Sequence, residues 1–86
     1  MPHLLAKLKN VPVSLIKEIL ERDEAFHAEN NMFLEHIWQN EADPNEVLFL
    51  FRIDAIDATK KLISKLHSDA LKQDPKANLP EMTYLK

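Results

Sequence analysis

Two histidines lie near residues that could help them accept or donate protons. Asp23 and His27 are four positions apart, and on a helix a carboxylate at this spacing can orient an imidazole for general base catalysis. The alternative is a surface contact worth roughly 0.2–0.5 kcal/mol. His36 lies two positions before Trp38, so on a strand the two side chains share a face. The candidate catalytic residues are therefore His27, His36 and Asp23.

A mixed aromatic and cationic lining is also predicted around Trp38. If His36 and Trp38 lie on the same sheet face as Arg52, they could hold a small planar or anionic organic molecule, with His36 as a proton donor or acceptor. The alternative is a tryptophan at a subunit interface beside a half-exposed histidine on an edge strand. The candidate ligand-binding residues are Trp38, Arg52, His36, Leu48 and Leu50.

Other kinds of site are poorly supported. The chain has no cysteine, which excludes disulfides, thiolate ligands and a cysteine nucleophile. The four histidines form no metal-binding spacing, so neither a metal nor a cofactor is expected. The net charge of −3, without a dominant basic stripe, argues against nucleic acid. We expect no signal peptide or membrane span near Met1 and, with no cysteine, a cytoplasmic location.

The length of 86 residues predicts one domain, residues 1–86, whose core is small for its apolar content. Glycine is absent, so asparagine must supply tight or left-handed positions, for example at Asn10 and Asn30-Asn31. Hydrophobic spacing and turn residues predict a strand at 3–9, a helix from Ser14 to about Glu29, a segment at 32–40, a strand at 47–53, a helix capped by Asp54 and ending near Asp74, and a strand at 81–85.

Two interpretations of residues 32–40 remain open. As a strand, they place Leu34, His36 and Trp38 opposite Phe33, Glu35, Ile37 and Gln39. The element order is then β-α-β-β-α-β, a ferredoxin-like fold with a four-stranded antiparallel sheet and two helices on one face. As a continuation of the first helix, they would make the protein all-α. The predicted buried stripes are Leu15, Ile16, Ile19, Leu20 and Phe26 on the first helix, and Ile56, Leu62, Ile63, Leu66 and Ala70 on the second.

Residues 47–53 are apolar on both faces until Arg52, which predicts a central strand covered on both sides. Burying Arg52 under helices would be costly. Val47, Phe49, Phe51 and Ile53 should therefore face the helices, as should Leu4, Ala6 and Leu8 of the first strand. Leu48, Leu50 and Arg52 should face the other way, with His3, Leu5 and Lys7. Since this chain has too little helix to cover that second face, we expect a homodimer.

Three segments resemble the dimeric α+β barrel superfamily, and within it the small antibiotic biosynthesis monooxygenase-like domains. They are Asp43-Pro44-Asn45-Glu46-Val47, Ile53-Asp54-Ala55-Ile56-Asp57-Ala58 and Leu79-Pro80-Glu81-Met82-Thr83-Tyr84-Leu85. The resemblance implies two sheets packed face to face across a two-fold axis. Its members include cofactor-independent oxygenases, isomerases and haem-degrading enzymes. Many have glycine after the first helix, where this chain has Asn30-Asn31.

Three functions are compatible with these patterns. The first is a homodimeric module that binds a small aromatic or anionic organic molecule, in or beside the barrel or between sheet and helices. The second is a cofactor-independent monooxygenase or isomerase acting on a small aromatic or enolic substrate. The third is a module that serves only to dimerise.

Overall fold

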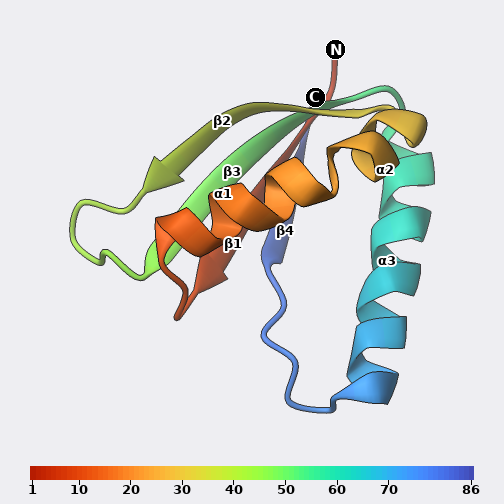
Figure 1. Cartoon of the computed structure of the whole chain (residues 1–86). Helices are drawn as coiled ribbons and strands as arrows, with labels where there is room; N and C mark the ends of the chain where they lie inside the picture. The colour runs from red at the N-terminus through yellow and green to blue at the C-terminus, as the bar shows by residue number, and fades with distance from the viewer.

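A computed structural model describes all 86 residues of the chain (Figure 1). The elements, in order, are β1 (His3–Lys9), α1 (Val13–Arg22), α2 (Glu24–Glu29), β2 (Met32–Gln39), β3 (Glu46–Ile53), α3 (Ile56–Gln73) and β4 (Glu81–Leu85). The strands form one antiparallel sheet in the order β2-β3-β1-β4, which places β1 and β3 in the centre as predicted. None of the helices has the length and apolar character that crossing a membrane requires.

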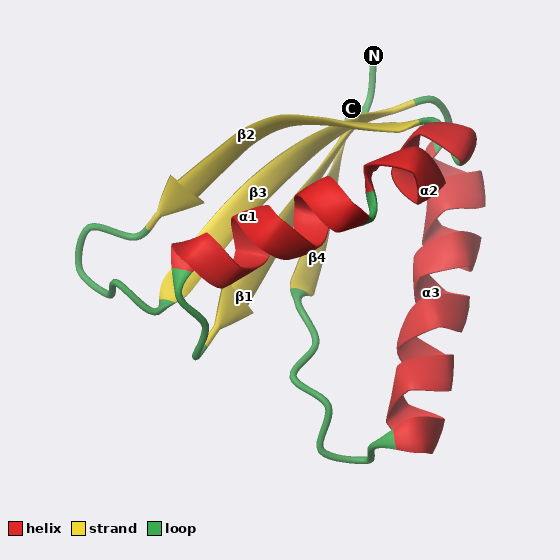
Figure 2. Cartoon of the chain, viewed as in Figure 1, coloured by secondary structure: helices red, strands yellow, loops and turns green.

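The helices lie on one side of the sheet, with α1 running across it and α3 at its flank (Figure 2). This arrangement confirms the ferredoxin-like α+β fold, and the all-α alternative for residues 32–40 is wrong because they form β2. The sheet face that meets the helices is apolar on both central strands. Its fully or nearly buried members are Leu4, Ala6, Leu8, Val47, Phe49, Phe51 and Ile53, as the alternation predicts.

The other sheet face carries the alternate residues of β1 and β3 and has no helix over it. We call it the open face; it carries His3, Leu5, Lys7, Leu48, Leu50 and Arg52. Leu48 and Leu50 are partly buried in the single chain, and Arg52 is exposed. The predicted facing of strand β3 is therefore confirmed.

The predicted helix from Ser14 to about Glu29 is instead two helices that meet at Asp23. Asp23 has φ −96° and ψ 8°, outside the helical range, although hydrogen bonds of helical spacing still cross it. Aspartate favours such breaks because its side chain competes with the helical backbone. The N-cap is Pro12, two residues before the predicted cap Ser14, and the helix begins at Val13.

Two other predictions about the helices need correction. Asp54 does not cap α3, because Ala55 is the N-cap residue and no side chain caps the helix there. The hydroxyl of Thr59 donates instead to the carbonyl of Ala55 at 2.9 Å, within the helix. The predicted buried stripes are also too broad, because Leu15, Phe26 and Leu66 are exposed while Ile16, Leu20 and Ile63 are buried.

Asparagine takes the left-handed positions that glycine would usually occupy. Asn31, between α2 and β2, has φ 58°, and Asn10, directly after β1, has φ 62°. Both lie where the sequence requires the chain to turn, and asparagine tolerates this region better than most residues. The predicted termination at Asn30-Asn31 is confirmed, with Asn31 as the left-handed residue.

A β-bulge at Glu35 divides β2 into two halves, and the alternation of side chains between the two sheet faces is shifted by one residue from one half to the other. Leu34 pairs with Phe51 and His36 pairs with Leu50, so Glu35 has no partner of its own on β3. An unpaired extra residue reverses the side-chain alternation beyond it. The prediction that Leu34 shares a face with His36 and Trp38 is therefore wrong. Leu34 lies on the side of the helices, whereas Phe33, His36 and Trp38 pair with open-face residues.

Candidate functional site

A cavity of about 220 Å³ lies between the sheet and the helices. Its sheet side is formed by β1, β3, β4 and the first residue of β2, and its other side by α1, α2 and α3. Ten of its thirteen lining residues are hydrophobic: they include Leu4, Leu8, Phe49, Phe51, Met82, Ile16, Ile19, Leu20 and Ile63. A dry cavity of about 150 Å³ can hold benzene, so this one has room for a single-ring organic molecule.

His27 and Asp23 are the ionisable residues of this cavity. The imidazole of His27 packs edge to face against Phe51, with ring centres 5.0 Å apart, and against Phe26 at 6.0 Å. It makes no side-chain hydrogen bond within the protein, so its nitrogens are free to bond a ligand. Burial lowers the pKa of His27, and the negative charge of Asp23 offsets part of this effect. The side chain is therefore mostly neutral at pH 7.

The carboxylate of Asp23 is directed to another partner. It accepts hydrogen bonds from Nε of Arg22 at 3.2 Å and from Nη2 at 3.5 Å. No side-chain hydrogen bond joins Asp23 to His27. The structure thus brings this predicted pair to one cavity, where Asp23 acts on His27 through its charge.

A wider groove lies on the other side of His27, between α1 and α2 and the edge strand β2. It has a volume of about 630 Å³, and both hollows are partly open to solvent. It shares Leu20, His27, Met32 and Phe51 with the cavity, so these side chains form the partition between the two hollows. Its charged residues are Lys17, Glu21 and Glu24 on the helices, and its β2 wall contributes Phe33, Leu34 and Ile37.

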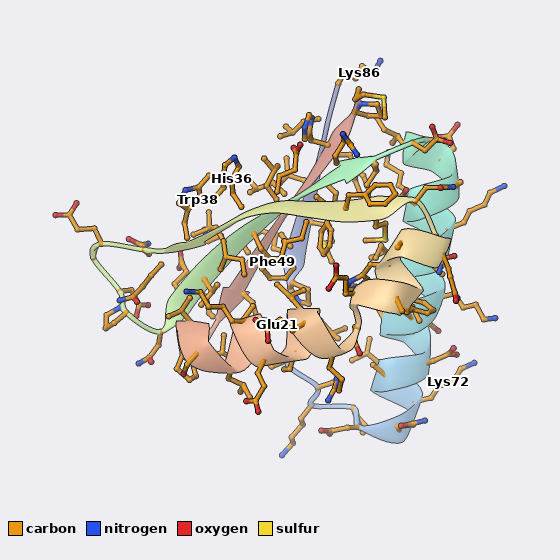
Figure 3. The ribbon with its side chains drawn as sticks, turned by 45° about the horizontal axis from the view of Figure 1, so that its top comes forward. Glu21, His36, Trp38, Phe49, Lys72 and Lys86 are labelled. Carbon is orange, nitrogen blue, oxygen red and sulfur yellow. The ribbon has the colours of Figure 1, made fainter.

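The predicted ligand-binding residues lie elsewhere, on the open face. His36 stacks on Trp38 with ring centres 5.0 Å apart and planes inclined by 20°. Their register partners on β3 are Leu50 and Leu48. Figure 3 shows both rings on the side of the sheet away from α1, whereas Phe49 points toward α1. None of the five predicted residues lines the cavity or the groove.

The same face carries further polar contacts. The guanidinium of Arg52 lies 5.2 Å from the centre of the Phe33 ring, a cation–π arrangement. Nε2 of His3 lies 2.8 Å from Oε1 of the bulge residue Glu35. Together with Trp38, these contacts make the aromatic and cationic surface that the sequence predicts, although the prediction did not include Phe33 or Glu35.

Two further ionisable side chains are partly buried outside both hollows. Burial lowers the pKa of His67 on α3 and raises the pKa of Tyr84 on β4. The ammonium group of Lys60 lies 5.2 Å from the centre of the Tyr84 ring. Both residues pack at the edge of the core. The structure contains no group of three or more histidine, aspartate or glutamate side chains that could hold a metal ion.

The sequence reasoning identified His27 and Asp23 but missed the space beside them. The sequence places Ile63 in a buried helical stripe, and Met32 and Met82 in strand segments. The same hydrophobic pattern results whether such residues fill the core or line a cavity. The groove was missed because the bulge at Glu35 turns Leu34 toward the helices.

Comparison with known proteins relates the chain to others through its fold. No protein-family model matches the sequence, and no curated protein is similar to it. A crystal structure of a candidate antibiotic biosynthesis monooxygenase from Deinococcus radiodurans superposes with a TM-score of 0.61 at 16% identity, over 100% of this chain and 91% of that chain. A protein from Agrobacterium tumefaciens gives a TM-score of 0.58 at 17% identity, over 100% and 92%. The chain therefore shares the ferredoxin-like α+β fold of these two proteins.

Proposed function

We propose that the chain is a homodimer in which each subunit binds one small organic molecule, with an aromatic ring in the cavity beside His27. The observation that carries the proposal is the cavity itself, a mostly apolar space holding an imidazole without a protein partner. Ligand sites in proteins commonly combine apolar walls with a few polar groups that fix orientation.

The open face supports the dimer. Trp38 is 46% exposed and Phe33 is 42% exposed, and they adjoin Leu48, Leu50 and Leu5 on the same face. Contiguous apolar surface of this kind commonly marks a protein interface. A second copy related by a two-fold axis would cover the face with the same residues, as the family resemblance implies. In this arrangement Trp38, Arg52, His36, Leu48 and Leu50 contact the partner.

The ligand proposal is tested by thermal shift with single-ring aromatic compounds. A ligand at a hundredfold excess over its Kd stabilises the folded state by about 2.7 kcal/mol, enough to raise the Tm by several degrees. Ile19→Phe places a larger side chain at the cavity wall and should abolish the shift, whereas His36→Ala, on the open face, should keep it. Compounds that stabilise Ile19→Phe as much as the wild type would show that the cavity is not their site.

The dimer is tested by light scattering at micromolar concentration. The wild type should have the mass of two chains. Leu50→Arg places a charge in the middle of the open face and should give single chains. Leu71→Arg is the control, because Leu71 is an exposed leucine that lies on α3, away from the open face. A wild-type protein with the mass of one chain contradicts the proposal.

A cofactor-independent oxygenase is the second candidate, favoured by the neutral imidazole at an apolar cavity. In this reaction His27 would take a proton from an activated CH₂ group of an aromatic or enolic substrate. The resulting anion would react with O₂, which oxidises the CH₂ to a carbonyl and leaves one oxygen atom as water. Oxygen uptake with aromatic or enolic substrates that carry an activated CH₂ group should fall strongly in His27→Ala and persist in His36→Ala. Oxygen uptake that is unchanged in both variants would show that neither His27 nor His36 acts as the base.

A further inference from the structure

The polar side chains of the cavity beside His27 are mainly hydrogen-bond acceptors. Among its thirteen lining residues, only Asp23 and His27 have side chains that form strong hydrogen bonds. An ionised carboxylate can only accept hydrogen bonds, whereas a neutral imidazole has one donor and one acceptor nitrogen. The walls contain no lysine, arginine, serine, threonine, asparagine or tyrosine. A ligand group that donates therefore has more partners here than a group that only accepts.

The backbone of these two residues adds no free donor. The amide of Asp23 donates to the carbonyl of Ile19 at 3.0 Å, and the amide of His27 donates to the carbonyl of Asp23 at 3.0 Å. Pro80, which lines the cavity from the segment before β4, has no amide hydrogen. The two methionine sulfurs on the walls are weak acceptors. Among the side chains, the only donor is then the single N–H of the neutral imidazole.

A charged ligand is unfavourable in this cavity. Ten of the thirteen lining residues are hydrophobic, so an ion would lose much of its hydration on entry. An anion would find no lysine or arginine on the walls and would meet the negative charge of Asp23. A cation would have only the Asp23 carboxylate, which already accepts two hydrogen bonds from Arg22. A neutral polar group avoids both costs.

We propose that the ligand of the cavity is a neutral single-ring compound whose polar group, a hydroxyl or a ring N–H, donates a hydrogen bond to the unprotonated nitrogen of His27. This inference rests on the proposed function, because it assigns a chemical class to the molecule in the cavity. It sets aside the anionic alternative of the sequence analysis. The volume of about 220 Å³ limits the molecule to about one ring, since a cavity of about 150 Å³ holds benzene.

Four probes of similar size test the inference: 4-methylphenol, its isomer anisole, p-xylene and benzoate. 4-Methylphenol can donate and is neutral at about pH 7, because the pKa of a phenol is about 10. Anisole can only accept, and p-xylene does neither. Binding is followed by NMR titration, with the methyl signals of Leu4 and Ile63 reporting on the cavity and those of Leu34 on the groove. 4-Methylphenol should bind roughly threefold to tenfold more tightly than anisole, the effect of about one net hydrogen bond, and benzoate should bind most weakly.

Two variants separate the hydrogen bond from the shape of the cavity. His27→Phe keeps a ring on the wall without its nitrogens, so it should abolish the preference for 4-methylphenol over anisole while p-xylene still binds. Asp23→Asn introduces an amide that can donate, so it should narrow the preference. His67→Phe is the control, because His67 is a partly buried histidine that lines neither hollow, and it should keep the wild-type preference.

The ring nitrogens of His27 provide a measurement that needs no variant. Their NMR signals should move when 4-methylphenol binds to the wild type and should stay in place when p-xylene binds. If anisole binds in the cavity as tightly as 4-methylphenol, or benzoate binds most tightly, the donor inference is overturned and the cavity proposal stands. If no probe perturbs the cavity signals, the proposed function fails, and the inference fails with it.

Discussion

His27 has a different environment from the other histidines of the chain. His36 stacks on Trp38 at the open face, His3 bonds Glu35 on the same face, and His67 packs on α3. Only His27 lines both the cavity and the groove. Its imidazole packs against the aromatic rings of Phe51 and Phe26 and makes no side-chain hydrogen bond. Burial is therefore the main cause of its lowered pKa.

The lowered pKa of His27 predicts a pH-dependent contribution to stability. In the unfolded chain its pKa returns to about 6.5, so the unfolded state binds more protons between this value and the folded-state pKa. The contribution is fully present above about pH 6.5 and is lost as the pH falls toward the folded-state pKa. Between about pH 7 and pH 5, thermal unfolding should therefore show a steeper loss of Tm for the wild type than for His27→Gln.

NMR titration of the imidazole provides the direct measurement, with a midpoint below 6.5 expected for His27. His67→Gln serves as the control, because the His67 pKa is also lowered and its removal should leave the His27 midpoint in place. A His27 midpoint at or above 6.5 would contradict the desolvation argument.

At the scale of single residues, the sequence revealed the ionisable groups but not their partners. The spacing of Asp23 and His27 predicted their proximity, and the structure places both at one cavity. It could not reveal that Arg22 holds the Asp23 carboxylate, because a neighbouring residue in a regular helix would point elsewhere. The contact lies where the helix breaks at Asp23.

The elements depend on a few residues that end or interrupt them. Asn10 and Asn31 provide the left-handed positions, and Glu35 provides the bulge in β2. Strands β1 and β4 have the predicted bounds, because alternation and turn residues define them locally. Alternation alone could not predict the bulge, since an extra residue is visible only against the partner strand.

Asn31→Ala should destabilise the domain by about 1 kcal/mol, because a Cβ-bearing residue other than asparagine is disfavoured at φ 58°. Asn31→Gly should change the free energy of unfolding by less than about 0.5 kcal/mol, since glycine takes positive φ without strain. Urea unfolding measures both. An equal loss in the two variants would mean that the asparagine side chain, rather than the backbone angle, matters.

Ile63 and Leu66 lie three positions apart on α3 and test how this helix packs. Ile63 is 8% exposed and Leu66 is 38% exposed, although the sequence predicts both in the buried stripe. Ile63→Ala should cost about 2–4 kcal/mol and Leu66→Ala less than about 1 kcal/mol, measured by urea unfolding. Similar losses for both would mean that Leu66 is covered in solution, for example by another subunit.

The whole molecule is an α+β domain with one covered and one open sheet face. The sequence predicted this asymmetry from residues 47–53, where Arg52 indicated which face is open. It could not predict the cavity, because the same apolar residues describe a filled core equally well. The homodimer stays a prediction, argued from the apolar side chains of the open face.

Trp38 is the only tryptophan and lies on the open face, so its fluorescence reports on dimer formation. On dilution its emission should move to longer wavelength, as the ring becomes exposed, with a midpoint that matches the change in mass by light scattering. Leu50→Arg should emit at long wavelength at every concentration, and Leu71→Arg should behave as the wild type. A wild-type emission maximum that never changes while the mass does would place the interface elsewhere.

The order of strands has a consequence for how the domain folds. β1 lies between β3 and β4, and His3 pairs with both Arg52 and Leu85. The side-chain amide of Asn78 also donates a hydrogen bond to the backbone carbonyl of Lys9, so both ends of β1 contact residues far along the chain. A central strand whose pairing partners are distant in sequence gives the domain a high contact order. We therefore expect it to refold in about milliseconds to seconds. The amides of β1 should accordingly exchange with solvent only when the whole domain unfolds.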